Sequence, residues 1–82
     1  MILSPLRKDL RAYLTKHQLT IKWSKVQKLF NDDIRHPSLH VELLQPTWRG
    51  VYSFRIDRKY RALFFINLNG EAEVFAITNH YT

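Results

Sequence analysis

The chain has 82 residues, of which 45% are hydrophobic and 13% aromatic, and it contains no cysteine. We expect a single domain over residues 1–82 with a packed core, and the lack of cysteine excludes disulfides and thiolate metal sites. Thirteen Lys and Arg against seven Asp and Glu give a net charge of +6, which favours polyanions such as nucleic acids as partners.

The first half of the chain predicts a helical hairpin. Ser4 and Pro5 predict a helix start, because a serine hydroxyl can cap the first turn and proline fits the first helical position. Apolar residues then recur with helical spacing at Leu6, Leu10, Tyr13, Leu14 and His17. A second helix is expected from Thr20 toward Ile34, ended by Pro37 because proline disfavours the helical conformation of the residue before it.

After Pro37 the apolar pattern changes to the alternation that is typical of strands. Asn69 and Gly70 indicate a hairpin turn, since both residues tolerate a positive φ. The expected strands are 39–44, 51–57, 60–67 and 72–79. The predicted fold class is α+β, with an N-terminal two-helix hairpin packed on one face of a three- to four-stranded antiparallel sheet.

The alternation also predicts where the strand arginines lie. If Tyr52 and Phe54 face the helices, Arg55 and Arg61 lie on the opposite, open face of the sheet. An arginine in mid-strand with apolar neighbours needs an anion or a carboxylate as its partner. Glu42 is the internal candidate, so a structural salt bridge and a phosphate site are both open for either arginine.

From Glu42 to Tyr81 the residues resemble the RelE/ParE superfamily of bacterial toxins, in particular its YoeB/Txe branch of ribosome-dependent mRNA interferases. A lysine that is common in that branch three residues after the glutamate is replaced by Gln45, and Thr82 follows the His-Tyr pair that usually ends the chain. The matching positions are Glu42, Leu44, Gly50, Tyr52, Arg55-Ile56, Tyr60-Arg61 and His80-Tyr81.

The resemblance implies a RelE-like fold and the toxin role of a type II toxin–antitoxin system. The implied activity is that of an endoribonuclease that cleaves mRNA on the ribosome, with no metal and no small-molecule cofactor. The implied partners are mRNA, the ribosome and a cognate acidic antitoxin protein. We expect a cytoplasmic protein with no membrane association.

Metal-free RNA cleavage by the ribose 2′-OH needs a base, an acid and positive charge on the phosphate. We expect Glu42 to be the base, His80 the acid and Arg61 the phosphate clamp. Tyr81 would stack on a base or orient the nucleotide.

Four further residues are expected to contact RNA or its phosphates: Arg55, Arg49, Gln45 and Trp48. Arg55 would support Arg61. The sequence leaves three roles possible for Trp48: it stacks on RNA, docks a partner or packs back on the core.

The competing prediction is a binding module without catalysis. A ParE-like or decayed toxin fold keeps the region of Arg55 and Arg61 and acts by capturing a protein partner. The two predictions differ in whether Glu42, Arg61 and the terminal His80-Tyr81 pair surround one concavity.

Overall fold

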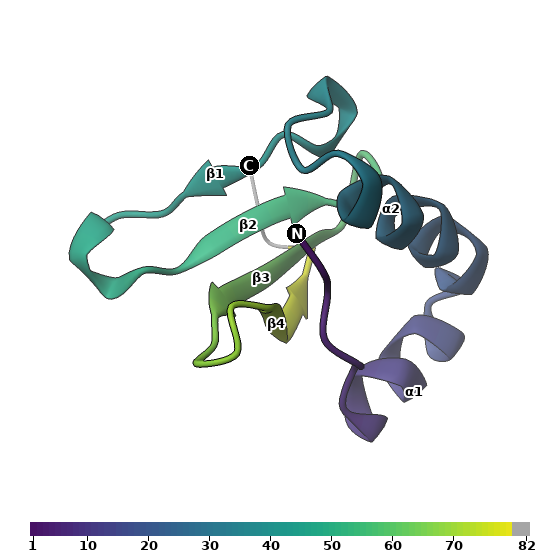
Figure 1. Cartoon of the computed structure of the whole chain (residues 1–82). Coiled ribbons are helices and arrows are strands. Elements are labelled where there is room, and N and C mark those ends of the chain that lie inside the picture. Colours follow the sequence, from purple (N-terminus) through teal and green to yellow (C-terminus); the bar gives the residue numbers. More distant parts are fainter. Residues whose placement is uncertain (80–82) are drawn as a thin grey trace.

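The computed structural model describes residues 1–79 of the chain. Two helices come first, α1 (Lys8–Lys16) and α2 (Thr20–Asp32). The strands are β1 (Glu42–Leu43), β2 (Tyr52–Arg55), β3 (Arg61–Ile66) and β4 (Ala72–Thr78). Each strand pairs antiparallel with the next, so the sheet order is β1-β2-β3-β4 (Figure 1). The α+β class with four antiparallel strands is therefore confirmed.

The helices lie on one side of the sheet (Figure 1), and α2 contributes the largest core side chains. The Phe30 ring lies 5.1 Å from that of Phe54 and 5.4 Å from that of Phe64, measured between centroids. Trp23, about two turns earlier on the same face of α2, has its ring 5.7 Å from that of Phe54. Burying each such side chain contributes about 1.5–3 kcal/mol. This packing fixes which face of β2 and β3 is covered and which is open.

The predicted helix start at Ser4 is wrong. α1 begins at Lys8, and the segment before it extends beside β4. The N–H of Ser4 donates to the carbonyl of Ala72 at 2.9 Å, and Leu3 forms a parallel bridge to the same residue. The N–H of Leu3 donates to Asn31 Oδ1 at 2.9 Å, and its side chain is only 5% exposed. Long-range pairing and core burial outweigh the local capping preference of serine.

The first predicted strand is also too long. Only Glu42–Leu43 pair with β2, because Pro37–Leu39 form a 3₁₀ turn (η1) and His40 has a left-handed φ of 46°. A left-handed residue interrupts an extended chain. The second helix ends at Asp32, two residues before the predicted Ile34. The other three strands lie within their predicted ranges.

The tight connection between β2 and β3 is held by one carboxylate. Asp57 Oδ1 accepts the backbone N–H groups of Lys59 and Tyr60, both at 2.8 Å. Asp57 Oδ2 accepts from Lys22 Nζ on α2 at 2.9 Å. The turn is thus tied to the helical layer, and it places the ends of β2 and β3 side by side.

Candidate functional site

The open face of the sheet carries the polar residues of the candidate site. In the strand register, Glu42 lies opposite Ser53, and Arg55 lies opposite Arg61. Arg61 also lies opposite Thr78 on β4. Because side chains alternate along a strand, these five residues share one face, as the sequence predicted for the two arginines.

Arg61 is the centre of this arrangement. It is only 6% exposed, although it carries a positive charge. Its Nε and Nη2 groups donate to Ser53 Oγ at 3.1 and 2.9 Å, and Nη2 also donates to the backbone carbonyl of His40. These two acceptors fix the position of the guanidinium at the wall of the open face.

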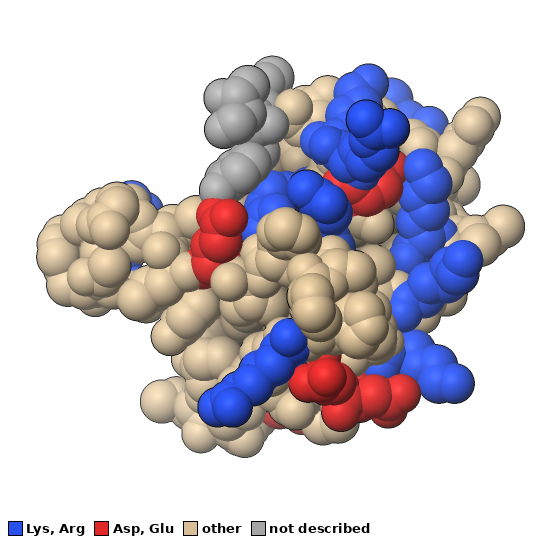
Figure 2. Space-filling model, turned by 90° about the horizontal axis from the view of Figure 1, so that it is seen from above, with Lys and Arg blue, Asp and Glu red and all other residues tan. Residues whose placement is uncertain are grey.

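A hollow of about 260 Å³ opens beside Arg61. Four of its lining side chains are cationic and two are carboxylates. The lining residues are His40, Glu42, Arg55, Asp57, Arg58, Lys59 and Arg61, which we call the cationic hollow. Figure 2 shows that Lys and Arg side chains outnumber Asp and Glu on the face seen from above. The hollow is therefore suited to an anion with one or two negative charges, such as a phosphodiester.

The two carboxylates of the cationic hollow have different roles. Burial opposes the ionisation of Asp57, but hydrogen bonds from Lys22 and from the backbone of Lys59 and Tyr60 outweigh it and lower its pKa. Asp57 is thereby committed to the turn as an anion. Glu42 is exposed and lies on the sheet face beside Ser53, where it is accessible to a ligand in the hollow.

The structure does not bring every predicted contact residue to this hollow. Gln45, Trp48 and Arg49 belong to the connection between β1 and β2 and are absent from its lining. Trp48 and Arg49 instead line a second, larger hollow at the far end of the open face. Trp48 is 84% exposed, so it does not pack back on the core. Gln45 is exposed and lines neither hollow.

The predicted acid His80 and the predicted stacking residue Tyr81 lie outside the described residues. Within residues 1–79, no group of three or more His, Cys, Asp or Glu side chains is arranged to hold a metal ion. Over the same range, no helix has both the length and the apolar character that crossing a membrane requires.

Sequence reasoning missed the groups that hold Arg61. The alternation that puts Arg55 on the open face also puts Ser53 there, two residues earlier, and this was the available signal. No sequence pattern predicted the hydrogen bond to the carbonyl of His40. This contact depends on a left-handed backbone conformation of His40, which the residue type does not predict. Arg58 and Lys59, which also line the hollow, were not among the residues predicted for the site.

Comparison with known proteins assigns no family. No protein-family model matches the sequence, and no curated protein is significantly similar to it. The chemistry of the cationic hollow and the groups that hold Arg61 therefore carry the functional argument.

Proposed function

We propose that the protein is a RelE-like toxin of a type II toxin–antitoxin system, an endoribonuclease that cleaves mRNA on the ribosome. The observation that carries this proposal is the buried guanidinium of Arg61, held by Ser53 and His40 beside an accessible carboxylate, Glu42. Burying a cation costs free energy unless something compensates for the lost water. A fixed cation at the wall of an open hollow is what stabilisation of a charged phosphorus centre requires.

In the proposed reaction, the ribose 2′ oxygen attacks the adjacent phosphorus while the bond from phosphorus to the 5′ oxygen breaks. The products are a 2′,3′-cyclic phosphate and a free 5′-OH. Glu42 accepts the proton of the 2′-OH, and Arg61 stabilises the negative charge on the pentacoordinate phosphorus, with support from Arg55. A well-placed acid or base contributes about 10²–10⁴-fold to the rate.

The proposal assigns the proton donor to His80, which gives a proton to the leaving 5′ oxygen, and base stacking to Tyr81. Their place in the chain supports this assignment, because Thr78 lies opposite Arg61 in the sheet and His80 follows two residues later in the sequence. The proposed partners are mRNA, the ribosome and an acidic antitoxin. The ribosome would position the message, so cleavage of free RNA is expected to be slow.

A second candidate function is protein capture by a ParE-like or decayed toxin fold. One observation favours it: Trp48 is largely exposed beside further apolar side chains, and exposed apolar patches often mark protein-binding surfaces. In that case the cationic hollow would bind a carboxylate of the partner, and no RNA would be cut.

Primer extension on a translated message decides between these candidates. The purified protein should produce cuts with 5′-OH ends, and Glu42→Gln should reduce the cleavage rate by about 10²-fold or more because it removes the base. Lys25→Ala is the matched control, since this exposed residue lies on α2 and lines neither hollow. A folded wild-type protein that leaves the message intact would exclude the nuclease and favour protein capture.

A further inference from the structure

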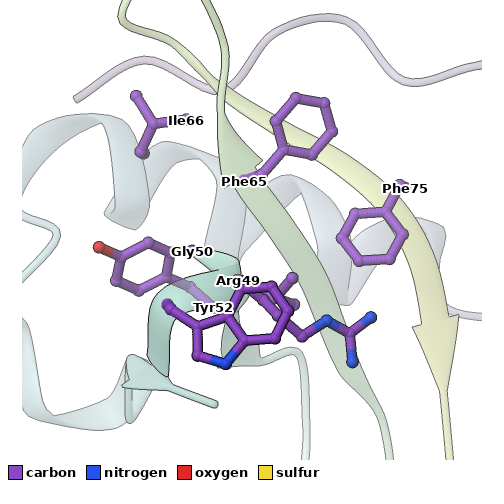
Figure 3. Close-up of a pocket in the computed structure, with 8 residues that line it drawn as sticks. Arg49, Gly50, Tyr52, Phe65, Ile66 and Phe75 are labelled. Carbon is purple, nitrogen blue, oxygen red and sulfur yellow. The ribbon is translucent and has the colours of Figure 1, made fainter. Parts of the chain in front are cut away.

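The second hollow lies where the connection between β1 and β2 meets the ends of β3 and β4 (Figure 3), and we call it the aromatic groove. Its volume is about 770 Å³. Four of its eight lining residues are aromatic. Arg49 is the charged side chain in the lining that residues 1–79 provide. The lining residues are Trp48, Arg49, Gly50, Val51, Tyr52, Phe65, Ile66 and Phe75.

The mouth of the groove is ordered, although Trp48 is exposed. Thr47–Arg49 form a 3₁₀ turn (η2), closed by a hydrogen bond of 3.2 Å from the N–H of Gly50 to the carbonyl of Thr47. Gly50 has a φ of 66°, a left-handed conformation that a side chain would strain. The N–H of Leu44 donates to the carbonyl of Val51 at 2.8 Å and closes the base of the loop. Trp48 is therefore held at the mouth of the groove by a defined turn.

The aromatic faces of the groove are available to a flat ligand. Phe65 and Phe75 are only half-buried, and their ring centroids lie 6.0 Å apart. Figure 3 shows the rings of Phe65 and Phe75 on one side of β3 and the ring of Tyr52 on the other, with the Arg49 side chain below them in this view. Aromatic rings and guanidinium planes are the surfaces on which proteins hold unpaired nucleobases.

The groove shares part of its lining with the face on which the cationic hollow opens, whereas Tyr52 and Ile66 reach it from the other face of the sheet. On β3, Arg61 lines the hollow and Phe65 lines the groove, and both have the same strand parity. Arg55 on β2 lines the hollow, and Val51, the residue before β2, lines the groove. These two residues also have the same strand parity. Four residues of strand separate the two sites, about 13 Å at roughly 3.3 Å per residue.

We propose that the aromatic groove is a nucleobase-binding subsite for the single-stranded RNA whose phosphate occupies the cationic hollow. This inference rests on the proposed function for the chemistry at Arg61, but not for binding in the groove. A strand stacked as in a duplex advances roughly 3.4 Å per nucleotide and covers the distance in about four nucleotides. An extended RNA strand covers the same distance with fewer nucleotides. The groove therefore binds a base up to about four nucleotides from the phosphate in the hollow.

Charge selects RNA over an apolar protein segment as the occupant. The groove has no acidic lining residue among those described, the face continues into four cationic side chains, and the whole chain carries +6. A polyanion is therefore attracted at the hollow by these four side chains and at the groove by Arg49. Base stacking in the groove would then fix the register of the strand.

The test is a length series of 2′-O-methyl oligoadenylates, from the dinucleotide to the hexanucleotide, which the 2′-OH mechanism cannot cut. Binding is measured at low ionic strength by fluorescence anisotropy and by quenching of tryptophan emission. Trp23 is only 6% exposed, so a stacked base should quench Trp48. Affinity should rise between the dinucleotide and the pentanucleotide. Trp48→Ala should abolish this rise and weaken pentanucleotide binding about 5- to 150-fold.

Two controls keep the result specific. Trp48→Phe keeps an aromatic face and should retain most of the rise in affinity. Leu68→Ala removes another fully exposed apolar side chain, in the turn between β3 and β4, and should change nothing. Trp48→Ala should also leave the salt dependence of binding unchanged, whereas Arg55→Ala should lower its slope by about one.

The outcomes separate this inference from the proposed function. If Trp48→Ala binds every length like the wild type and Trp48 is not quenched, the inference is wrong, whatever the cleavage assay shows. If quenching occurs only with an acidic peptide and not with RNA, the groove docks proteins and the inference is equally overturned. If the groove binds bases but Glu42→Gln has no effect on cleavage, the inference holds and the catalytic assignment fails.

Discussion

At the scale of single residues, the candidate site depends on one hydroxyl. Ser53 is fully buried, and its oxygen accepts two of the hydrogen bonds that hold the guanidinium of Arg61. The carbonyl of His40 accepts a further hydrogen bond from the Nη2 group of Arg61. A buried donor that loses its acceptor keeps the full cost of its lost water, so these contacts determine both the position of the charge and part of the stability.

Ser53→Ala should therefore destabilise the protein by about 1–3 kcal/mol, because it leaves two N–H donors of Arg61 without this acceptor. Urea denaturation measures the change. Ser24→Ala is the matched control on an exposed serine of α2, and it should cost less than about 0.5 kcal/mol. Equal effects of the two substitutions would show that Ser53 does not hold Arg61.

At the scale of elements, the turn between β2 and β3 positions both arginines of the site. The carboxylate of Asp57 binds the backbone of this turn and the ammonium group of Lys22 on α2. The strand ends that carry Arg55 and Arg61 are thus tied to the helical layer. A change at Asp57 should act on the site through the turn and not by direct contact with RNA.

The pKa of Asp57 is lowered by these hydrogen bonds against the opposing effect of burial. A carboxylate with a lowered pKa in the folded state adds stability above its unfolded pKa of about 3.9, and this stability is lost as the pH falls through the folded value. The free energy of unfolding should therefore fall between about pH 5 and pH 2. Asp57→Asn should make this dependence shallower. An identical pH profile for the variant would refute the role of Asp57 as the ionised anchor of the turn.

The sheet and its two faces could be predicted because successive side chains of a strand point to opposite faces. The alternation of apolar and polar residues therefore indicates which face is buried. Phe54 and Phe64 are 0% and 1% exposed, and the parity of those residues alone put Arg55 and Arg61 on the open face. The N-terminus could not be predicted from local preference, since the pairing of Leu3 with Ala72 joins residues far apart in the sequence.

The candidate site could be predicted only in part. Glu42 and Arg61 were named from the family resemblance and from the chemistry that RNA cleavage needs, and the structure brings both to one hollow. The left-handed His40 leaves no pattern in the sequence, so the second group that holds Arg61 was missed. Arg49 and Trp48 were expected to contact RNA or its phosphates, but the connection between β1 and β2 carries them to the aromatic groove and not to the cationic hollow.

At the scale of the whole molecule, one open face combines a cationic hollow with an aromatic groove, on a chain with a net charge of +6. The other face of the sheet is covered by the helices, so the cationic hollow and its fixed guanidinium are presented to a polyanionic partner on the open face. For the proposed toxin, this surface would be shared in turn by RNA and by the acidic antitoxin that blocks it.

Expression of the protein alone should accordingly arrest bacterial growth and translation. Coexpression of an acidic protein from the neighbouring gene should restore growth, because it would neutralise the same basic surface. Growth curves with incorporation of a labelled amino acid measure both effects. Normal growth and translation while folded protein accumulates would argue strongly against the toxin proposal.

The most direct measurement of the central claim is the single-turnover cleavage rate of Arg61→Lys on a ribosome-bound message. Lysine keeps the positive charge but cannot reproduce the forked contacts to Ser53 and His40, so the charge moves away from the phosphorus. The rate should fall about 10²-fold or more, while Arg35→Lys, at an exposed position outside the cationic hollow, should cut at the wild-type rate. Both variants should first be shown to melt cooperatively. Cleavage by a folded Arg61→Lys protein at the wild-type rate would contradict the claim that the fixed guanidinium of Arg61 is the phosphate clamp.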